Sequence, residues 1–367
     1  MATARPAAAR RRRTALSGAE LLALRAGPRA LDHLRRRGLD PADVRAIPGA
    51  AGGPKGLALL PLDIRLARDW LPRMARVELA GASIGAWRMA ALAQRDPIAA
   101  LGRLRQAYVR GQNYPKNPSP AEVSATIRAL ARQVLADGRL EPRDGISLDV
   151  FVALARGPLA GRRGRAAFTR AAAVNAISRT RLARHFGRVV FHAGAPSTLV
   201  DAHDAFGVER VALDQRNLED ALTASGSIPM VCDPVVDIAG APRGDCWDGG
   251  LVDYHLLLPH ARHDGIVLYP HFAPHVTPGW LDKFLPWRRA PRAHPWLANV
   301  LVVAPSAAFV ARLPNRKLPD RSDFYRYDID HDSRIRDWER AIAECERFAD
   351  AAMRWLERPD PSIVGGL

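Results

Sequence analysis

Two glycine-rich turns, each between an apolar run and a helical pattern, constrain the fold of this chain most. The apolar run at 44–49 leads into the turn "AAGGPKG" at 50–56 and then into a helical pattern. The run "RVELAGAS" at 76–83 leads in the same way into "IGAWRMAALAQ" at 84–94. A repeated strand and crossover helix is typical of parallel sheets covered by helices. We therefore expect an α/β fold with three layers, α/β/α, around a central and mostly parallel sheet.

The rest of the chain supplies further elements for such a fold. Strands are expected at "RVVFHAG", "GIVLYPHF" and "NVLVVAP", and the amphipathic "RIRDWERAIAECERFADAAMRWLE" predicts a C-terminal helix packed on the sheet. Near the start we expect a short helix interrupted at Gly27-Pro28, and at about 98–160 a mostly helical insertion. Residues 1–17 are expected to be a disordered basic tail, and 18–360 a single domain.

Composition indicates a cytoplasmic protein with a large core. Of the 367 residues, 48% are hydrophobic, yet no apolar run reaches the ~18 residues of a membrane-spanning helix. The basic N-terminal stretch carries Glu20 and Arg25 where a signal peptide needs an apolar segment. Cys232, Cys246 and Cys345 are widely spaced and odd in number, which favours reduced, buried side chains over a disulfide framework or a zinc site.

The formal net charge of +16 comes almost entirely from arginine, since the chain has only four lysines. Two interpretations remain open at this stage. The arginines form solvated faces, or they attract the protein to an anionic surface of lipid headgroups or nucleic acid. No zinc-finger or RNP-type signature is present, so we expect no specific nucleic-acid partner.

The second turn contains a serine between two glycines, in Gly81-Ala82-Ser83-Ile84-Gly85. At a tight strand-to-helix turn, a side chain on either flanking glycine would collide with neighbouring backbone. Such a turn exposes the Ser83 hydroxyl at the carboxyl end of a strand. The N–H of Ile84 and the dipole of the following helix can then stabilise an oxyanion there.

The first turn, Gly52-Gly53-Pro54-Lys55-Gly56, exposes consecutive backbone N–H groups near the same edge of the sheet. If it neighbours Ser83, Gly52 and Gly53 can donate two hydrogen bonds to a tetrahedral intermediate. A phosphate-binding turn and a flexible loop are the alternatives. The nucleotide motif G-x-x-x-x-G-K-[ST] is not matched, because Gly56 follows Lys55 where that motif requires Ser or Thr.

A third element is Asp248-Gly249-Gly250, in "DCWDGGLVDYHLLLP". By itself it is also compatible with an ordinary turn. As a functional group, the Asp248 carboxylate can accept the proton of the serine. Partial burial beside Ser83 would raise its pKa and so make it a stronger base.

Taken together and in this chain order, the three elements resemble those of the patatin-like phospholipases. That family has Gly-Gly-Gly-x-Arg/Lys-Gly, then Gly-x-Ser-x-Gly, then Asp-Gly-Gly/Ala, and "ALTASGSIPMVCDPV" looks like its Ala-Ser-x-x-x-Pro segment. The resemblance covers roughly residues 40–260. One departure is Ala51, which stands where the family's first glycine is usual.

The resemblance implies a serine acyl hydrolase of the lipase type, without metal or cofactor. Ser83 would attack the ester carbonyl of a phospholipid, lysophospholipid or related acyl lipid, and Asp248 would take its proton. The amides of Gly52, Gly53 and Ile84 would hold the oxyanion, and water would release the acyl-enzyme. The supporting motif positions are Lys55, Gly56, Gly81, Gly85, Gly249 and Gly250.

Two other functions remain open. A Ser-His-Asp carboxylesterase could use the same serine, because His255, His260, His263 and His271 all follow Asp248, in the order that such a triad requires. The spacing of His260 with His263, and of His271 with His275, could suggest a metal site, but no acidic or cysteine ligand accompanies them at a familiar distance. A non-catalytic lipid- or nucleic-acid-binding protein that kept the fold is the other alternative.

Aromatic and basic residues alternate in "HVTPGWLDKFLPWRRAPRAHPW" at 275–296. Rings of this kind sit at the headgroup level of a bilayer, and cations meet anionic lipid there. We therefore expect Trp280, Phe284 and Trp287 to contribute to peripheral contact with an anionic membrane. A proline-broken loop with inward-facing tryptophans is the alternative.

Overall fold

The computed structural model describes residues 16–136, 139–140, 142–195, 197, 204–290 and 293–367. Its strands belong to one mixed sheet. They are β1 (Leu22–Ala26), β2 (Val44–Gly49), β3 (Val77–Ala82), β4 (Ile146–Ala155), β5 (Phe186–Ala193), β6 (Val208–Ala212), β7 (Val235–Val236), β8 (Asp245–Asp248), β9 (Ile266–Pro270), β10 (Val300–Pro305) and β11 (Gly365–Gly366). The predicted tail, 1–17, lies almost wholly outside the described residues.

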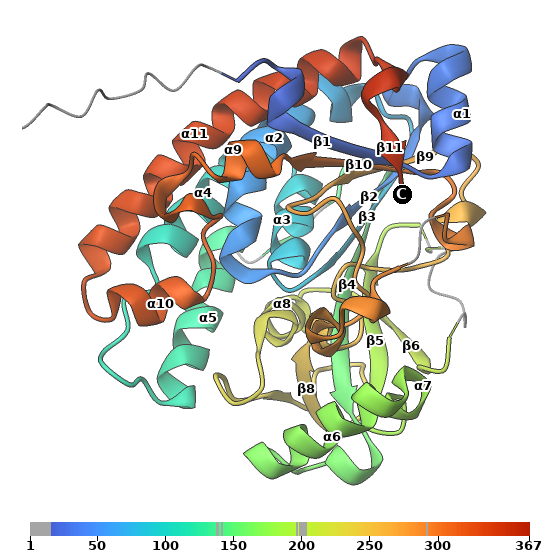
Figure 1. Cartoon of the computed structure of the whole chain (residues 1–367). Helices are drawn as coiled ribbons and strands as arrows, with labels where there is room; N and C mark the ends of the chain where they lie inside the picture. The colour runs from blue at the N-terminus through green and yellow to red at the C-terminus, as the bar shows by residue number, and fades with distance from the viewer. Residues whose placement is uncertain (1–15, 137–138, 141, 196, 198–203, 291–292) are drawn as a thin grey trace, which may run out of the picture.

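The sheet runs in the order β11-β1-β10-β9-β2-β3-β4-β5-β6 (Figure 1). Its centre, from β10 to β4, is parallel, whereas β1 joins β10 and β5 joins β4 in antiparallel fashion. Every residue of β3, β4 and β10 is buried. This is expected of central strands that are covered on both faces.

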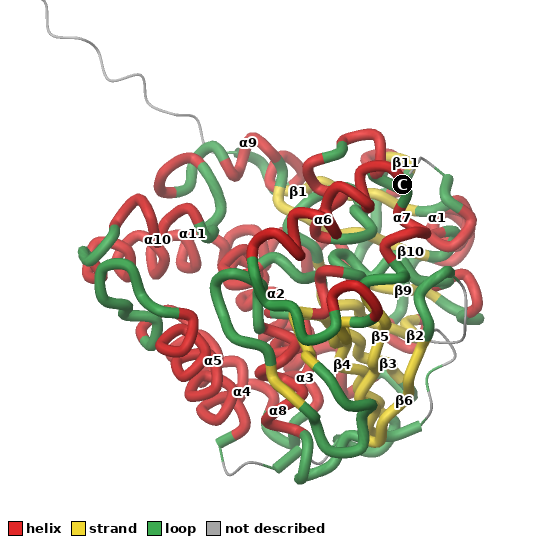
Figure 2. The backbone as a smooth tube through the Cα atoms, turned by 90° about the horizontal axis from the view of Figure 1, so that it is seen from below, coloured by secondary structure: helices red, strands yellow, loops and turns green. Residues whose placement is uncertain are grey.

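Helices cover both faces of this sheet, which gives the three-layer α/β/α arrangement expected from the sequence (Figures 1 and 2). The helices are α1 (Pro28–Arg37), α2 (Leu60–Arg65), α3 (Ile84–Ala93), α4 (Pro97–Arg110), α5 (Pro120–Leu135), α6 (Arg165–Ile177), α7 (Arg179–Leu182), α8 (Leu218–Gly226), α9 (Ala307–Val310), α10 (Ser322–Tyr327) and α11 (His331–Glu357). Helix α3 packs directly on β2, β3 and β4. Helices α4 and α2 pack against α3, and α11 packs on α2 and α4. All ten residues of α3 are buried, so the helix after Ser83 is part of the core.

The structure corrects three of the sequence-based assignments. Residues 22–26, expected in a helix, form strand β1, because a short apolar run fits either element and here it pairs with β10. The insertion at 98–160 contains helices α4 and α5, but it ends in the central strand β4. The domain also continues past 360, since β11 pairs with β1.

Two further expectations from composition, on the cysteines and on membrane-spanning helices, can be compared with the described residues. Cys232, Cys246 and Cys345 are free thiols and are buried. Within the described ranges, no helix combines the length and the apolar character that crossing a bilayer requires.

Candidate active site

Ser83 lies between β3 and α3 in a backbone conformation that few side-chain-bearing residues adopt, with φ 56° and ψ −132°. The two flanking glycines make this turn possible. A Cβ atom on Gly85 would overlap the carbonyl oxygen of Gly49 at the end of β2, and one on Gly81 would lie 2.5 Å from the amide nitrogen of Ala86. The close approach of β2, β3 and α3 therefore requires both glycines and fixes the position of the Ser83 hydroxyl.

Strand β8 brings Asp248 to the same point from the opposite direction. The first part of β4 pairs with β3, up to Phe151 opposite Ala82, and its next residues pair with β8, with Val152 opposite Asp248. Because β8 is antiparallel to β4 while β3 is parallel to it, β3 and β8 end facing each other alongside β4. Ser83 and Asp248, distant in sequence, are thereby placed together.

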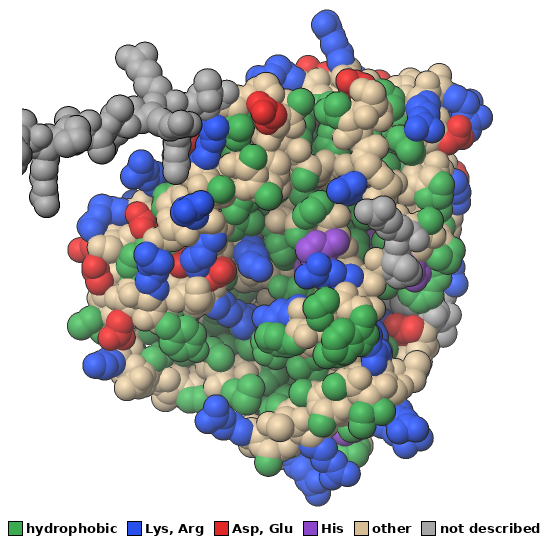
Figure 3. Space-filling model, in the orientation of Figure 1, with side chains coloured by type: hydrophobic (Ala, Val, Ile, Leu, Met, Phe, Trp, Pro, Cys, Tyr) green, Lys and Arg blue, Asp and Glu red, His purple; other side chains and the backbone are tan. Residues whose placement is uncertain are grey.

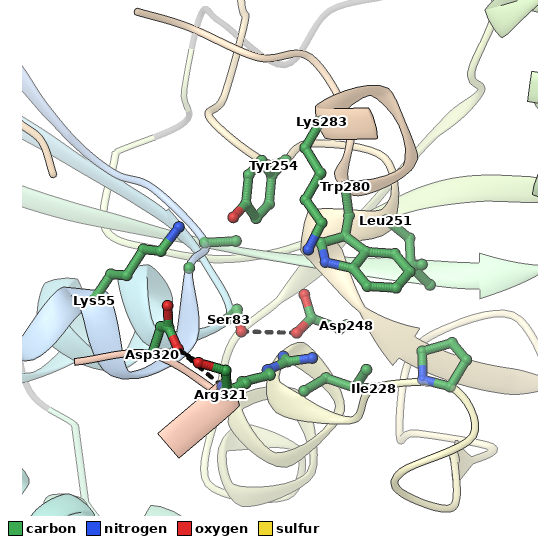
Figure 4. Close-up of a pocket in the computed structure, with 14 residues that line it drawn as sticks. Lys55, Ser83, Ile228, Asp248, Leu251, Tyr254, Trp280, Lys283, Asp320 and Arg321 are labelled. Atoms are coloured by element: carbon green, nitrogen blue, oxygen red, sulfur yellow. Dashed lines mark hydrogen bonds between the residues drawn. The ribbon is translucent and has the colours of Figure 1, made fainter. Parts of the chain in front are cut away.

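The side chains of these two residues form a direct hydrogen bond. The Ser83 hydroxyl donates to Oδ2 of Asp248 over 2.7 Å, and the N–H of Gly250 donates to Oδ1 over 2.7 Å (Figure 4). Burial raises the pKa of Asp248, while the charge of Arg321 and the bonds from Ser83 and Gly250 lower it; the net direction is upward. A raised pKa makes this carboxylate a better proton acceptor than one in water.

The end of α8 holds both residues through buried hydrogen bonds. The Ser225 hydroxyl accepts from the N–H of Ser83 at 2.9 Å and donates to the carbonyl of Phe151 at 2.8 Å. The carbonyl of Ser227 accepts from the N–H of Asp248 at 2.7 Å. The "ASGS" segment at 224–227 thus ties the turn at Ser83 to the turn at Asp248.

The glycine-rich turn after β2 lies against the same site. Gly56 packs on the Ile84 side chain, and Gly52 lines the cavity that contains Ser83. Within the described part of the chain, the N–H groups of Gly52, Gly53 and Ile84 donate to no other residue. These three N–H groups are therefore free to meet an oxyanion.

Position 51 shows how the structure accommodates alanine instead of glycine. A Cβ atom on Gly250 would lie 2.7 Å from the methyl group of Ala51. The space for this methyl group exists because position 250 has no side chain. The departure from the resemblance at Ala51 is therefore compatible with the turn after Asp248.

Ser83 and Asp248 open into a cavity of about 250 Å³. Figure 3 shows this face of the molecule hollowed, with basic and hydrophobic side chains gathered around the hollow. The lining residues are Ala51, Gly52, Lys55, Ser83, Ile228, Pro229, Asp248, Leu251, Tyr254, Trp280, Lys283, Asp320, Arg321 and Ser322 (Figure 4). Of the predicted site residues, this lining includes Gly52, Lys55, Ser83, Asp248 and Trp280.

Among the described residues, no histidine takes part in this arrangement. The hydrogen bonds of the Ser83 and Asp248 side chains involve only each other and Gly250 among the described residues. His255, His260 and His271 are buried in the core, and burial lowers the pKa of His271 to about 3. His255 stacks on Tyr254 instead of facing Ser83. The part of the chain that the structure describes therefore places no histidine where the Ser-His-Asp alternative requires one.

The aromatic residues of the 275–296 segment have different environments. Trp280 is half-buried in the cavity wall, whereas Phe284 and Trp287 are 64% and 72% exposed. Trp280 lies in the cavity wall with Leu251 and Lys283, so Phe284 and Trp287 are the more exposed of the three, and their contact with a membrane stays a prediction. Arg292, in the same segment, lies outside the described residues.

A buried ion pair supports the site from behind. Nε and Nη2 of Arg88, on α3, donate to the two carboxylate oxygens of Asp63, on α2, over 2.6 and 2.8 Å. Neither side chain is accessible to solvent. The helix after Ser83 is therefore bound to the helix that follows the glycine-rich turn.

Two residues that act on Ser83 or Asp248, Ser225 and Arg321, are not marked by any motif in the sequence. Ser225 belongs to "ALTASGSIPMVCDPV", but nothing in the spacing of this segment indicates a hydrogen bond to the Ser83 amide. Arg321 lies in an irregular stretch before α10 with no motif around it. Among the described residues, no group of three His, Cys, Asp or Glu side chains is placed to hold a metal ion.

Comparison with known proteins gives no further information on this site. Neither a protein-family model nor a curated protein matches the chain.

Proposed function

We propose that this chain is a serine acyl hydrolase of the patatin-like type, which cleaves ester bonds of phospholipids or related acyl lipids. The observation that supports this proposal most is the 2.7 Å hydrogen bond between the Ser83 hydroxyl and Asp248, at a strained strand-to-helix turn that opens into a cavity. A serine and a base in direct contact are the minimum for nucleophilic catalysis of acyl transfer.

The reaction would begin when the Ser83 oxygen attacks the ester carbonyl and Asp248 takes the hydroxyl proton. The oxyanion of the tetrahedral intermediate would accept hydrogen bonds from the amides of Gly52, Gly53 and Ile84. As the intermediate collapses, the C–O bond to the leaving alcohol breaks and Asp248 returns the proton to that oxygen. Asp248 then takes a proton from water as the water oxygen attacks the acyl-serine. When the bond between the acyl carbon and the Ser83 oxygen breaks, Asp248 returns this proton to Ser83 and the fatty acid leaves.

The exposed apolar side chains near the cavity support a lipid substrate. Ile228 and Pro229 line the cavity, and the next two residues, Met230 and Val231, are exposed. Trp287 lies exposed in the aromatic segment beyond Lys283. We include peripheral contact of these side chains with an anionic bilayer in the proposal, because an apolar rim lets acyl chains enter from a membrane.

Covalent labelling separates this function from a non-catalytic one. A fluorophosphonate should label the wild-type protein on Ser83 and should not label Ser83→Ala. A lipid panel should show fatty acid release by the wild type and none by Ser83→Ala or Asp248→Asn. A correctly folded wild type that is neither labelled nor active on any ester would contradict the proposal.

A further inference from the structure

Three cationic side chains from separate segments converge on the cavity of Ser83. Lys55 comes from the 3₁₀ segment Gly53–Leu59, Lys283 from the 3₁₀ segment Trp280–Phe284, and Arg321 from the residue before α10. Figure 4 shows the three around Ser83 and Asp248. No described carboxylate lies within ion-pair distance of any of them, whereas the buried Arg88 and Arg188 and the partly buried Arg179 are each paired with a carboxylate.

The acidic residues of the wall do not neutralise this group. Asp320 lines the cavity, but its carboxylate binds Nζ of Lys317 at 2.6 Å and accepts from both the N–H and the hydroxyl of Ser322. Asp248 is engaged with Ser83 and Gly250. The cavity therefore carries an excess of positive charge beside the nucleophile.

Aromatic rings hold the two amines at the wall. Nζ of Lys283 lies 4.6 Å from the ring centres of both Trp280 and Phe284, and Nζ of Lys55 lies 5.3 Å from that of Phe272. Such contacts orient an ammonium group and leave its N–H groups available. Lost hydration at the wall and the neighbouring charges of Arg321 and Lys55 lower the pKa of Lys283 to about 8, so the cluster is electrostatically strained without an anion.

A second cavity, of about 600 Å³, adjoins the first and continues its basic character. The two share Lys55, Tyr254, Lys283 and Asp320, and the second adds Arg289 and Lys317. A substrate with its ester at Ser83 can therefore extend past the two shared lysines into a larger basic space. Its charged part would lie a short distance from the scissile bond.

We propose that Lys55, Lys283 and Arg321 form a subsite for a phosphate group of the substrate, so that the enzyme selects esters of net negative charge over zwitterionic ones. Three cations match a phosphate monoester better than a single carboxylate, and the arginine fork can bind two of its oxygens. The choline cation of a zwitterionic lipid would be repelled by the same group. This inference rests on the proposed hydrolase function.

The test compares two short-chain lipids with the same acyl groups, used as monomers: dihexanoyl phosphatidate and dihexanoyl phosphatidylcholine. We expect the wild type to have the higher kcat/KM for the phosphatidate. Lys283→Gln and Arg321→Gln should each lower the ratio of the two constants by about tenfold, because each removes a charge-assisted hydrogen bond. Lys283→Arg should keep the ratio.

Two control variants remove the same charge elsewhere. Lys116 and Arg340 are exposed and lie outside both cavities. Lys116→Gln and Arg340→Gln should leave the ratio at the wild-type value. If all four glutamine variants change it equally, the selectivity comes from the total charge of the protein, and the subsite does not exist.

The pH dependence of the ratio of the two kcat/KM values distinguishes a charged subsite from a purely structural role of Lys283. The groups whose charges act on the Lys283 amine are Arg321, Lys55 and Asp320. The ratio should fall as the pH rises through about 8, because Lys283 loses its charge, and the fall should be absent in Lys283→Arg. A ratio independent of pH in both proteins would contradict the assignment.

Two further arms identify the source of the phosphate and separate this proposal from the proposed function. Selectivity toward long-chain phosphatidate in vesicles indicates a lipid headgroup, and selectivity toward a butyryl ester of glycerol 3-phosphate indicates a water-soluble ester; either supports the subsite. Calorimetric titration of Ser83→Ala with dihexanoyl phosphatidate measures binding without turnover. Active protein without binding or selectivity overturns the subsite alone, whereas binding without activity or labelling overturns the hydrolase function.

Discussion

The protonation state of Asp248 controls the chemistry that we propose for Ser83. Burial raises the pKa of this carboxyl group, and the positive charge of Arg321 is the largest opposing effect. Asp248 accepts a proton only when it is ionised. The pH dependence of the reaction therefore reports the balance between burial and Arg321.

We predict an acid limb in kcat/KM that lies above the ordinary aspartate pKa of 3.8. With a neutral, soluble ester, activity should fall as the pH decreases through the raised pKa of Asp248. Arg321→Gln should move this limb to higher pH, since it removes a charge that favours the ionised form. Arg340→Gln serves as the control and should leave the limb in place.

Replacing the base should have opposite effects on activity and stability. Asp248→Asn should lower kcat by ~10³-fold or more, as the amide cannot accept the proton. A group whose pKa is raised in the folded state makes the fold less stable at pH values above that pKa, and stability is regained as the pH falls. The amide oxygen can still accept from the N–H of Gly250, and the amide NH2 can donate to the Ser83 oxygen, without the buried charge.

Thermal unfolding at neutral pH should therefore show a higher Tm for Asp248→Asn than for the wild type. The difference should shrink in acid, where the wild-type carboxyl group is protonated as well. A lower Tm at neutral pH would show that the ionised carboxylate stabilises the site and would contradict the direction given to its pKa.

Ser225 is predicted to position the nucleophile through the backbone amide of Ser83. Ser225→Ala leaves that amide and the Phe151 carbonyl without their partner, which should cost about 1–3 kcal/mol of stability. We expect kcat to fall roughly tenfold with little change in KM, because the turn moves but the cavity remains. Ser227→Ala is the matched control, since Asp248 is held by the backbone carbonyl of Ser227, which this substitution keeps.

The sequence predicts those site residues that stand in a recognisable local motif. Ser83 and Asp248 stand beside glycines that are required because a Cβ atom there would overlap neighbouring backbone. Arg321 has no such signal, because its place beside Ser83 depends on how the segment after β10 returns over the sheet. Long-range side-chain pairs of this kind are set by tertiary packing, which one sequence does not display.

At the level of elements, the site depends on β3 and β8 meeting along β4. The apolar run before a glycine turn predicts β3. No comparable signal marks β4, which lies where the sequence analysis expects a helical insertion. The run "ISLDVFVALA" alternates only over its first five residues and is then continuously apolar, and a short apolar run fits a buried helix as well as a buried strand. Strand β8 is only four residues long, too short for a recognisable pattern in the sequence, and it is a strand because it pairs with β4.

The buried pair between α2 and α3 is an element-scale prediction. Arg88→Met should destabilise the protein by about 3–5 kcal/mol, because the Asp63 carboxylate is left in the core without its partner. The double variant Asp63→Leu/Arg88→Met should recover most of this loss. Urea unfolding measures both effects, and equal losses in the single and double variants would show that the pair acts through packing alone.

On the scale of the whole molecule, the net charge of +16 has a distribution that composition does not reveal. Many arginines pair with carboxylates across the fold, whereas Lys55, Lys283 and Arg321 remain unpaired within the described structure at the cavity. Figure 3 shows hydrophobic side chains around the hollow on the same face. The face that carries the cavity is therefore both apolar and basic, as expected of a surface that meets anionic lipid.

The last prediction concerns this face. Trp287 and Met230 are 72% and 48% exposed, and neither is among the residues that line the two cavities described above. Trp287→Ser combined with Met230→Ser should weaken binding to vesicles of phosphatidylglycerol and phosphatidylcholine by about tenfold or more, because two apolar side chains no longer leave water. Vesicle hydrolysis should fall in parallel, while hydrolysis of a soluble ester should stay near the wild-type rate.

Ile98→Ser provides the control for this experiment, since Ile98 is 42% exposed at the start of α4 and lies outside both cavities. Co-sedimentation with vesicles measures binding, and fatty acid release measures turnover. Binding should also weaken with added salt, because the basic side chains on this face attract the anionic lipid over a distance that ions screen. Unchanged vesicle binding in the double variant would place the docking surface elsewhere, and an equal loss in Ile98→Ser would show a general effect of surface polarity.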